Sequence, residues 1–270
     1  MKSALVAALL SFVFAVQGSS ARQRGREAQN GDSQNVGGHI ITVSRSGEAY
    51  AKPDLGILIM SIRSTSPIAD EAVADNAQKA KDVETALAGL GFGPSGYEIS
   101  SVTFGNEGGP RFPGQGDVTA YQANQYIYVF FDGPELADVA QLTQKAAAVI
   151  EALRKAGAVP ANNANGFSPV MLGGMQGSLI IYTIKDPTDY EHKALQVAIA
   201  RARDAAEDIA TGTGVKLMGL RDVQSGYLAG SGVIPRTGSG PLEGLRYRWF
   251  TTKSDELIIV ANATLQYDFK

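Results

Sequence analysis

Few side chains in this sequence have the type and spacing that catalysis requires. The chain has two histidines, His39 and His192, and no cysteine. A Ser-His-Asp arrangement would have to use one of these histidines, but no Gly-x-Ser-x-Gly nucleophile elbow is present. His192 is followed by Lys193 and so does not belong to a His-Glu-x-x-His zinc helix. We therefore predict no catalytic residue and no metal ligand, with a hydrolase site around His192 kept as an alternative.

Two further motifs resemble binding sites only in part. The run Gly89-Leu90-Gly91-Phe92-Gly93 is rich in glycine, but it ends a predicted helix, whereas a phosphate-binding loop must open one. Asp186 and Asp189 have the spacing of an acid–base couple and also that of a helix cap. Because capping explains this spacing without further assumptions, we predict no cofactor site at either motif.

Aromatic and basic residues alternate near the C-terminus. Trp249 lies between Arg248 and Phe250, directly after Arg246 and Tyr247. Such a pattern can stack on bases or sugars, but a chain with a net charge of −3 lacks the basic surface that nucleic acid binding needs. We interpret the cluster as an interface or a strand edge, and we predict no nucleic acid partner.

The N-terminus has the pattern of an export signal. Lys2 precedes an apolar run at residues 4–16, and the small residues Ser19 and Ala21 fit a signal-peptidase site. The run is too short to cross a bilayer comfortably, and no later segment is as long and apolar. We predict a signal peptide at 1–21, a polar disordered leader at 22–38, one folded domain at 39–270, and no transmembrane span in the mature chain.

The predicted elements form an α+β fold. Proline-started helices are expected at Ser66-Pro67, Gly133-Pro134 and Asp186-Pro187, and each ends at a glycine. The third helix carries a stripe of small residues for packing, namely Ala194, Ala198, Ala202 and Ala205, followed by Ile209. Strands are expected near 40–51 and at 55–62, 97–104, 120–131, 178–184, 217–224 and 256–269. The order predicts an antiparallel-rich sheet with three packed helices, built from two similar β-α-β-β halves.

Two long loops rich in glycine and proline interrupt this pattern, at 105–117 and 226–244. Loops of this length in a compact domain usually bind something or are disordered. Each contains a Pro-Arg pair, at Arg111 and Arg236. We predict that these loops make subunit contacts, so that deleting 105–117 would lower the mass of an oligomer.

Several local motifs together resemble the SIMPL-domain family over residues 40–269. They are Ile41-Thr42-Val43-Ser44, Gly47-Glu48-Ala49, Ala51-Lys52-Pro53-Asp54, the helix residues Asn76, Val83, Leu87 and Gly91, the strand residues Ile99-Ser100 and Tyr121-Gln122-Ala123, and the closing strand at 257–267. The resemblance implies an α+β fold, bacterial export, ring-like or barrel-like oligomers in some members, and an association with envelope or oxidative stress. It implies no catalytic residue.

Together, these features predict an exported, non-enzymatic protein that self-assembles into a homo-oligomer. We expect it in the periplasm or at the cell surface, where it would support envelope integrity or tolerance of oxidative stress, possible partners being itself and an envelope component. The alternative is a periplasmic ligand- or partner-binding module that uses the two loops and the Trp249 cluster.

Overall fold

A computed structural model describes residues 39–106, 120–161, 180–228, 242 and 245–270. The predicted signal peptide, the leader, Arg111, Arg236 and most of both long loops lie outside these residues. Residues 38–270 form one compact unit with a mixed α+β fold, in which all strand pairs are antiparallel. No helix of the described ranges is long and apolar enough to cross a membrane.

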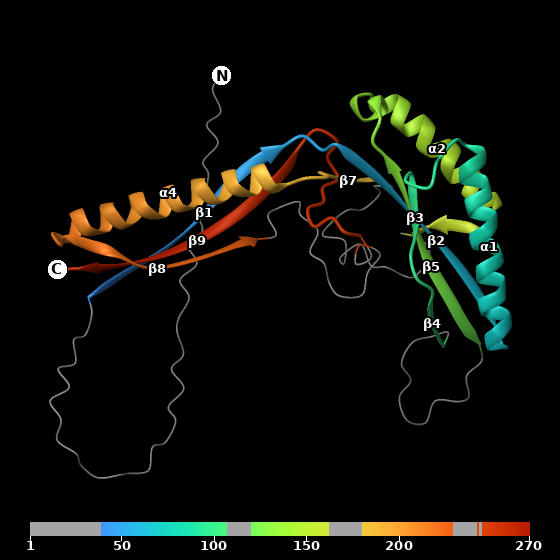
Figure 1. Ribbon diagram of the computed structural model, residues 1–270, viewed down its shortest axis with the longest axis horizontal. Helices are drawn as coiled ribbons and strands as arrows, with labels where there is room; N and C mark the ends of the chain where they lie inside the picture. The colour runs from blue at the N-terminus through green and yellow to red at the C-terminus, as the bar shows by residue number, and fades with distance from the viewer. Residues whose placement is uncertain (1–38, 107–119, 162–179, 229–241, 243–244) are drawn as a thin grey trace, which may run out of the picture. The chain divides into compact units, whose positions relative to one another are not determined.

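The first sheet has three strands in the order β1-β9-β8. They are β1 (Ile40–Ala51), β9 (Leu257–Phe269) and β8 (Leu217–Leu228). Apolar and small residues alternate with polar ones in β1, as the sequence predicted, and their side chains are buried beneath the long helix α4 (Thr188–Thr213). Figure 1 shows α4 lying along this sheet.

The small-residue stripe of α4 packs on β1 and β9 at very short distance. Gly47 of β1 lies so close to α4 that an added Cβ would be 2.2 Å from the carbonyl oxygen of Ala194. The stripe differs from its prediction in the last turns, where Ala206 and Ala210 are buried and Ile209 is 42% exposed. Because an α-helix has 3.6 residues per turn, buried residues spaced four apart shift gradually around the helix. The buried stripe therefore follows the twist of the sheet.

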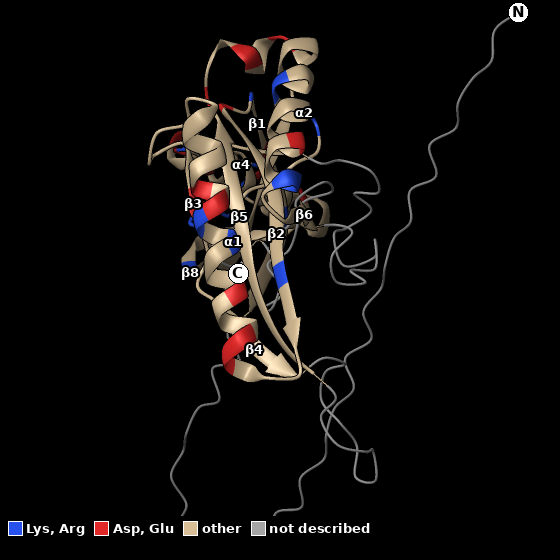
Figure 2. Cartoon of the chain, turned by 90° about the vertical axis from the view of Figure 1, so that its right-hand side faces the viewer, with Lys and Arg blue, Asp and Glu red and all other residues tan. Residues whose placement is uncertain are grey.

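The second sheet contains the remaining strands and carries two helices. Strands β3-β5-β2-β6 form its path, while β4 pairs with β5 and β7 with β2. The strands are β2 (Leu55–Ser66), β3 (Tyr97–Ile99), β4 (Thr103–Asn106), β5 (Tyr121–Phe131), β6 (Ala158–Pro160) and β7 (Ile180–Thr183). The helices α1 (Ala69–Gly89) and α2 (Val139–Lys155) bury an aliphatic core against β2 and β5. Their outer sides carry charges of both signs (Figure 2).

Helix starts follow the sequence signals with local corrections. Gly133-Pro134 opens a 3-10 helix, η1 (Pro134–Ala137), and α2 begins only after Asp138, whose carboxylate accepts from two backbone N–H groups of the first turn. Ser66 precedes α1, which starts at Ala69 rather than at Pro67. Asp186 accepts from the backbone N–H of Thr188, the first residue of α4, at 3.0 Å, but the N-cap itself is Pro187, one residue later than predicted.

Two short strands were not predicted. The stretch 97–104 is divided into β3 and β4 because Ser100 pairs with Tyr126 through its hydroxyl as well as its backbone. Strand β6 has only three residues and shows no alternation that a sequence pattern would reveal. The strands are also distributed over two sheets, since β7 pairs with β2, whereas β9 pairs with β1 on one side and with β8 on the other.

Candidate functional site

The most unusual surface of the described chain is the outer strand of the first sheet. β8 is twelve residues long and pairs with β9 along one edge, while its other edge has no partner among the described residues. Ten of its twelve residues are exposed, including Leu220 at 54% and Val223 at 46%. A long strand with a free edge and apolar side chains is a template for pairing with another chain.

Leu220, Val223 and Tyr227 of β8 face the same side of the sheet as α4, Tyr227 lying opposite the buried Ala261, whereas Leu228 faces the other side. Leu220 lies opposite Tyr267 of β9, and Val223 lies opposite Leu265, which is buried under the helix. Residues directly opposite in a ladder point to the same face. The helix packs on β1 and β9, so this face of β8 extends beyond the helix without a cover among the described residues.

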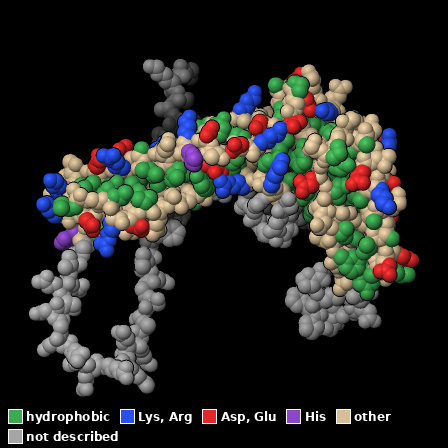
Figure 3. All heavy atoms as spheres, in the orientation of Figure 1, with side chains coloured by type: hydrophobic (Ala, Val, Ile, Leu, Met, Phe, Trp, Pro, Cys, Tyr) green, Lys and Arg blue, Asp and Glu red, His purple; other side chains and the backbone are tan. Residues whose placement is uncertain are grey.

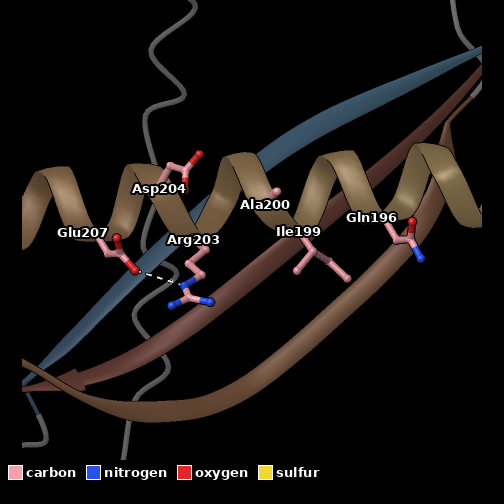
Figure 4. A pocket seen from close by; sticks show the side chains of 6 residues that line it. All are labelled: Gln196, Ile199, Ala200, Arg203, Asp204 and Glu207. Atoms are coloured by element: carbon pink, nitrogen blue, oxygen red, sulfur yellow. Dashed lines mark hydrogen bonds and ion pairs between the residues drawn. The ribbon is translucent and has the colours of Figure 1, made fainter.

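A hollow of about 470 Å³ lies along α4 beside this face, lined by Gln196, Ile199, Ala200, Arg203, Asp204 and Glu207. Figure 4 shows the side chains of Ile199 and Arg203 directed toward the β8 side, with Arg203 bound to Glu207 at 3.0 Å. Figure 3 shows hydrophobic side chains gathered where α4 and β8 run together. We call the apolar residues Ile199, Leu220, Val223 and Tyr227 the α4–β8 strip.

The sheet's opposite face is polar in its middle and apolar toward one end, where Leu228 lies opposite Val260 and Tyr50 lies opposite Ile258. Thr264 of β9 donates to the hydroxyl of Ser44 on β1 at 3.1 Å. Gln224 of β8 lies opposite Thr264 and is exposed. The two faces of β8 therefore differ, and only the face toward α4 carries the α4–β8 strip.

The sequence comparisons place this architecture in a family. The model of the SIMPL family, described as a protein of unknown function (DUF541), matches residues 41–243. The chain belongs to the SIMPL family. No curated protein gives a significant match. The matched residues end before β9, although β9 pairs with β1 along its whole length.

One family motif residue has a clear structural role in this SIMPL protein. Asn76 of α1 is fully buried, and its side-chain amide donates to the carbonyl oxygens of Ile62 and Ala123 at 3.4 and 3.2 Å. It therefore attaches the helix to β2 and β5 at once. These two hydrogen bonds give Asn76 a packing role, while its amide oxygen Oδ1 is buried without a hydrogen-bond partner among the described residues.

The residues first considered for catalysis do not come together. His39 is exposed at the start of β1, where its ring lies 5.2 Å from that of Phe269. His192 and Asp189 are exposed on α4. The glycine-rich run closes α1, and Gly91 has the left-handed φ of 83° that a helix end requires. Within the described residues, no group of His, Asp and Glu has the arrangement of a metal site.

The Trp249 cluster is organised around a buried acid that the sequence analysis missed. Glu191 is 6% exposed, and it accepts from Nε of Arg248 at 2.7 Å and from the indole N–H of Trp249 at 2.6 Å. A second guanidinium nitrogen of Arg248 binds its other oxygen. Glu191 is three residues before Ala194 and so lies on the buried stripe, which is the signal that could have found it.

This cluster connects the start of α4 to the segment before β9. The backbone groups of Tyr182 and Thr251 exchange two hydrogen bonds, and the hydroxyl of Thr183 donates to the carbonyl of Trp249 at 2.6 Å. Trp249 is buried at 4%, so it does not offer its ring for stacking. The indole packs inside the protein, so in the alternating run of basic and aromatic residues at 246–250 Trp249 is a core residue.

Proposed function

We propose that this SIMPL protein is an exported, non-enzymatic scaffold that self-assembles through the edge of β8 and the α4–β8 strip. The observation that carries the proposal is the edge of β8, which has no partner among the described residues and exposes Leu220 and Val223 over a strand of twelve residues. Natural proteins blunt such edges with proline, charges, short strands or β-bulges. β8 contains no proline, and its two irregularities lie in its first half, so the second half keeps a regular ladder with exposed apolar side chains.

A second copy is the partner that fits this edge. Twelve residues extend about 40 Å, so a second copy of the strand could pair along this whole length. The charges along β8 are Arg221 and Asp222, which cancel, so two copies meet without net repulsion. Two β8 strands paired antiparallel would join two three-stranded sheets into one of six.

In this proposal the assembly acts outside the cytoplasm, in the periplasm or at the cell surface, and supports envelope integrity or tolerance of oxidative stress. The export pattern at residues 1–21 and the family resemblance support this part. A scaffold of this kind works by its shape and its contacts, so it needs no catalytic residue.

The mass of the exported protein tests the proposal. Light scattering after size exclusion should give a discrete multiple of the monomer. Replacing Leu220→Lys and Val223→Lys together places two charges in the α4–β8 strip, and we expect the mass to fall to that of a smaller species. Circular dichroism should show that this variant keeps its secondary structure.

Gln224→Lys is the matched control, because it adds a lysine to the polar face of the same strand. We expect it to keep the wild-type mass. A monomeric wild type, or a double variant with the full assembly mass, would refute the proposal.

The alternative function, a ligand- or partner-binding module, is kept for a specific reason. A cleft lined by cationic side chains lies beside the Trp249 cluster. Binding there should change the fluorescence of Trp249, the chain's single tryptophan.

A further inference from the structure

We infer that the cleft between the segments 184–187 and 246–248 binds a small organic anion, by its carboxylate, through Arg246. The cleft has a volume of about 590 Å³ and is lined by Ile184, Lys185, Pro187, Arg246, Tyr247 and Arg248. This volume is within the range of small-molecule sites. The inference develops the binding-module alternative and does not depend on self-assembly.

The walls of the cleft are fixed by hydrogen bonds described above. The backbone pair of Tyr182 with Thr251 and the bond from Thr183 to Trp249 hold the two segments together. Glu191 of α4 accepts hydrogen bonds from Arg248 and Trp249 and so attaches the segment 246–248 to the helix. A site with such walls is formed before a ligand arrives, which lowers the entropy lost on binding.

Three of the six lining residues are cations, and they differ in what they already bind. Lys185 lies 2.9 Å from the carboxylate of Asp132, and Arg248 is engaged by Glu191. Arg246 has no carboxylate partner among the described residues. One of its nitrogens donates to the hydroxyl of Tyr247 at 2.9 Å, and its guanidinium carbon lies 5.1 Å from the centre of that ring.

The guanidinium of Arg246 is therefore oriented but not neutralised. It has five N–H donors in a planar fork, of which the Tyr247 contact uses one. A carboxylate matches this fork with two parallel hydrogen bonds. Of the neighbouring acids, Asp54 accepts from the backbone N–H of Lys185 and Asp132 binds the ammonium of Lys185, while Glu98 lies close enough to act on the charge of Arg246 but forms no ion pair with it.

The rest of the lining determines which anions fit. Ile184 and Pro187 are apolar, and Tyr247 lines the cleft beside them, although Ile184 and Tyr247 expose only 6% and 8% of their surface. An inorganic ion would leave the remaining apolar surface in contact with water. A carboxylate attached to a short apolar or aromatic group would cover it and gain the hydrophobic contribution as well.

Calorimetric titration with benzoate tests the inference, with benzamide as the neutral probe of the same shape and inorganic phosphate as the anion without an apolar part. We expect saturable binding of benzoate, a response of Trp249 fluorescence, and no measurable binding of benzamide. Arg246→Gln should weaken benzoate binding at least about tenfold, the loss of a charge-assisted pair of hydrogen bonds.

Arg45→Gln is the matched control, since Arg45 is an exposed arginine of β1 that binds only a backbone carbonyl, that of Ser44, among the contacts described. It should leave benzoate binding unchanged, and Arg246→Gln should keep the wild-type mass in light scattering. Each of four results would overturn the inference: benzoate does not bind, benzamide binds as tightly as benzoate, phosphate binds and benzoate does not, or Arg246→Gln keeps the full affinity for benzoate. None of these outcomes affects the assembly test.

Discussion

The contact between Gly47 and α4 makes the first sheet sensitive to a single added methyl group. In Gly47→Ala the new Cβ would lie 2.2 Å from the oxygen of Ala194 and 2.3 Å from the nitrogen of Ala198. Both atoms belong to the helix backbone, so no side-chain rotation can relieve the overlap. The helix must therefore move away from β1.

The cost can be worked from this geometry. Separations below 3.0 Å are essentially never seen for a Cβ, so the helix must retreat by roughly 1 Å, which forfeits a quarter to a half of each affected dispersion contact. Overpacking of this kind costs about 1–3 kcal/mol, and contact with backbone favours the upper end. At about 2–4 °C per kcal/mol for a chain of this size, we expect Tm to fall by about 6–12 °C.

Thermal unfolding followed by circular dichroism measures this effect. Gly105→Ala is the control, because it adds the same methyl group to β4, where nothing lies within 4 Å. Its Tm should stay equal or rise slightly, since alanine loses less backbone entropy than glycine on folding. A Tm within about 2 °C of the wild type would correspond to a loss of less than about 1 kcal/mol. In that case the close packing of Gly47 against α4 would be refuted.

Two further substitutions probe the ion pairs. Glu191→Gln removes the buried charge that faces Arg248 and Trp249, and we expect it to lower the free energy of unfolding by about 1–3 kcal/mol; urea unfolding followed by Trp249 fluorescence measures this, and an unchanged midpoint would contradict it. The hydrogen bond from Lys145 lowers the pKa of Glu135. The stability that this ion pair contributes is therefore complete above the ordinary carboxyl pKa of about 4.3, and it is lost as the pH falls through the lower pKa of Glu135 in the folded protein. The free energy of unfolding, measured by urea titration between pH 6 and pH 3, should therefore fall more in the wild type than in Glu135→Gln. The difference should be up to about 1 kcal/mol, because Lys145 is half exposed. Equal falls in the two proteins would show that the pair contributes nothing.

Local signals in the sequence predicted most of the elements. Alternation in β1, the apolar run of β2 and the aromatic strand β5 gave their positions. Glycine marked the helix ends, and Gly91, Gly157 and Gly214 have the positive φ that explains why. These features depend on neighbours within a few residues, so a single sequence contains them.

The candidate sites were less accessible to sequence reasoning. The cluster around Trp249 was recognised as aromatic and basic, but its centre, Glu191, lies in the first turn of α4, outside the aromatic and basic pattern. The two residues are 58 positions apart, and nothing local to either one predicts the pairing. The two histidines lie in different elements, since His39 directly precedes β1 and His192 lies on α4.

By itself the sequence determined the family, the α+β class and the order of the principal helices and strands, because propensity, periodicity and capping act over a few residues. Only the tertiary structure decided that the strands divide into two sheets and that α4 leaves β8 uncovered. It alone placed Arg246 in a cleft beside Lys185. These arrangements join residues far apart in the chain, and they are chosen by which long-range pairings bury the most apolar surface with the fewest unpaired polar groups.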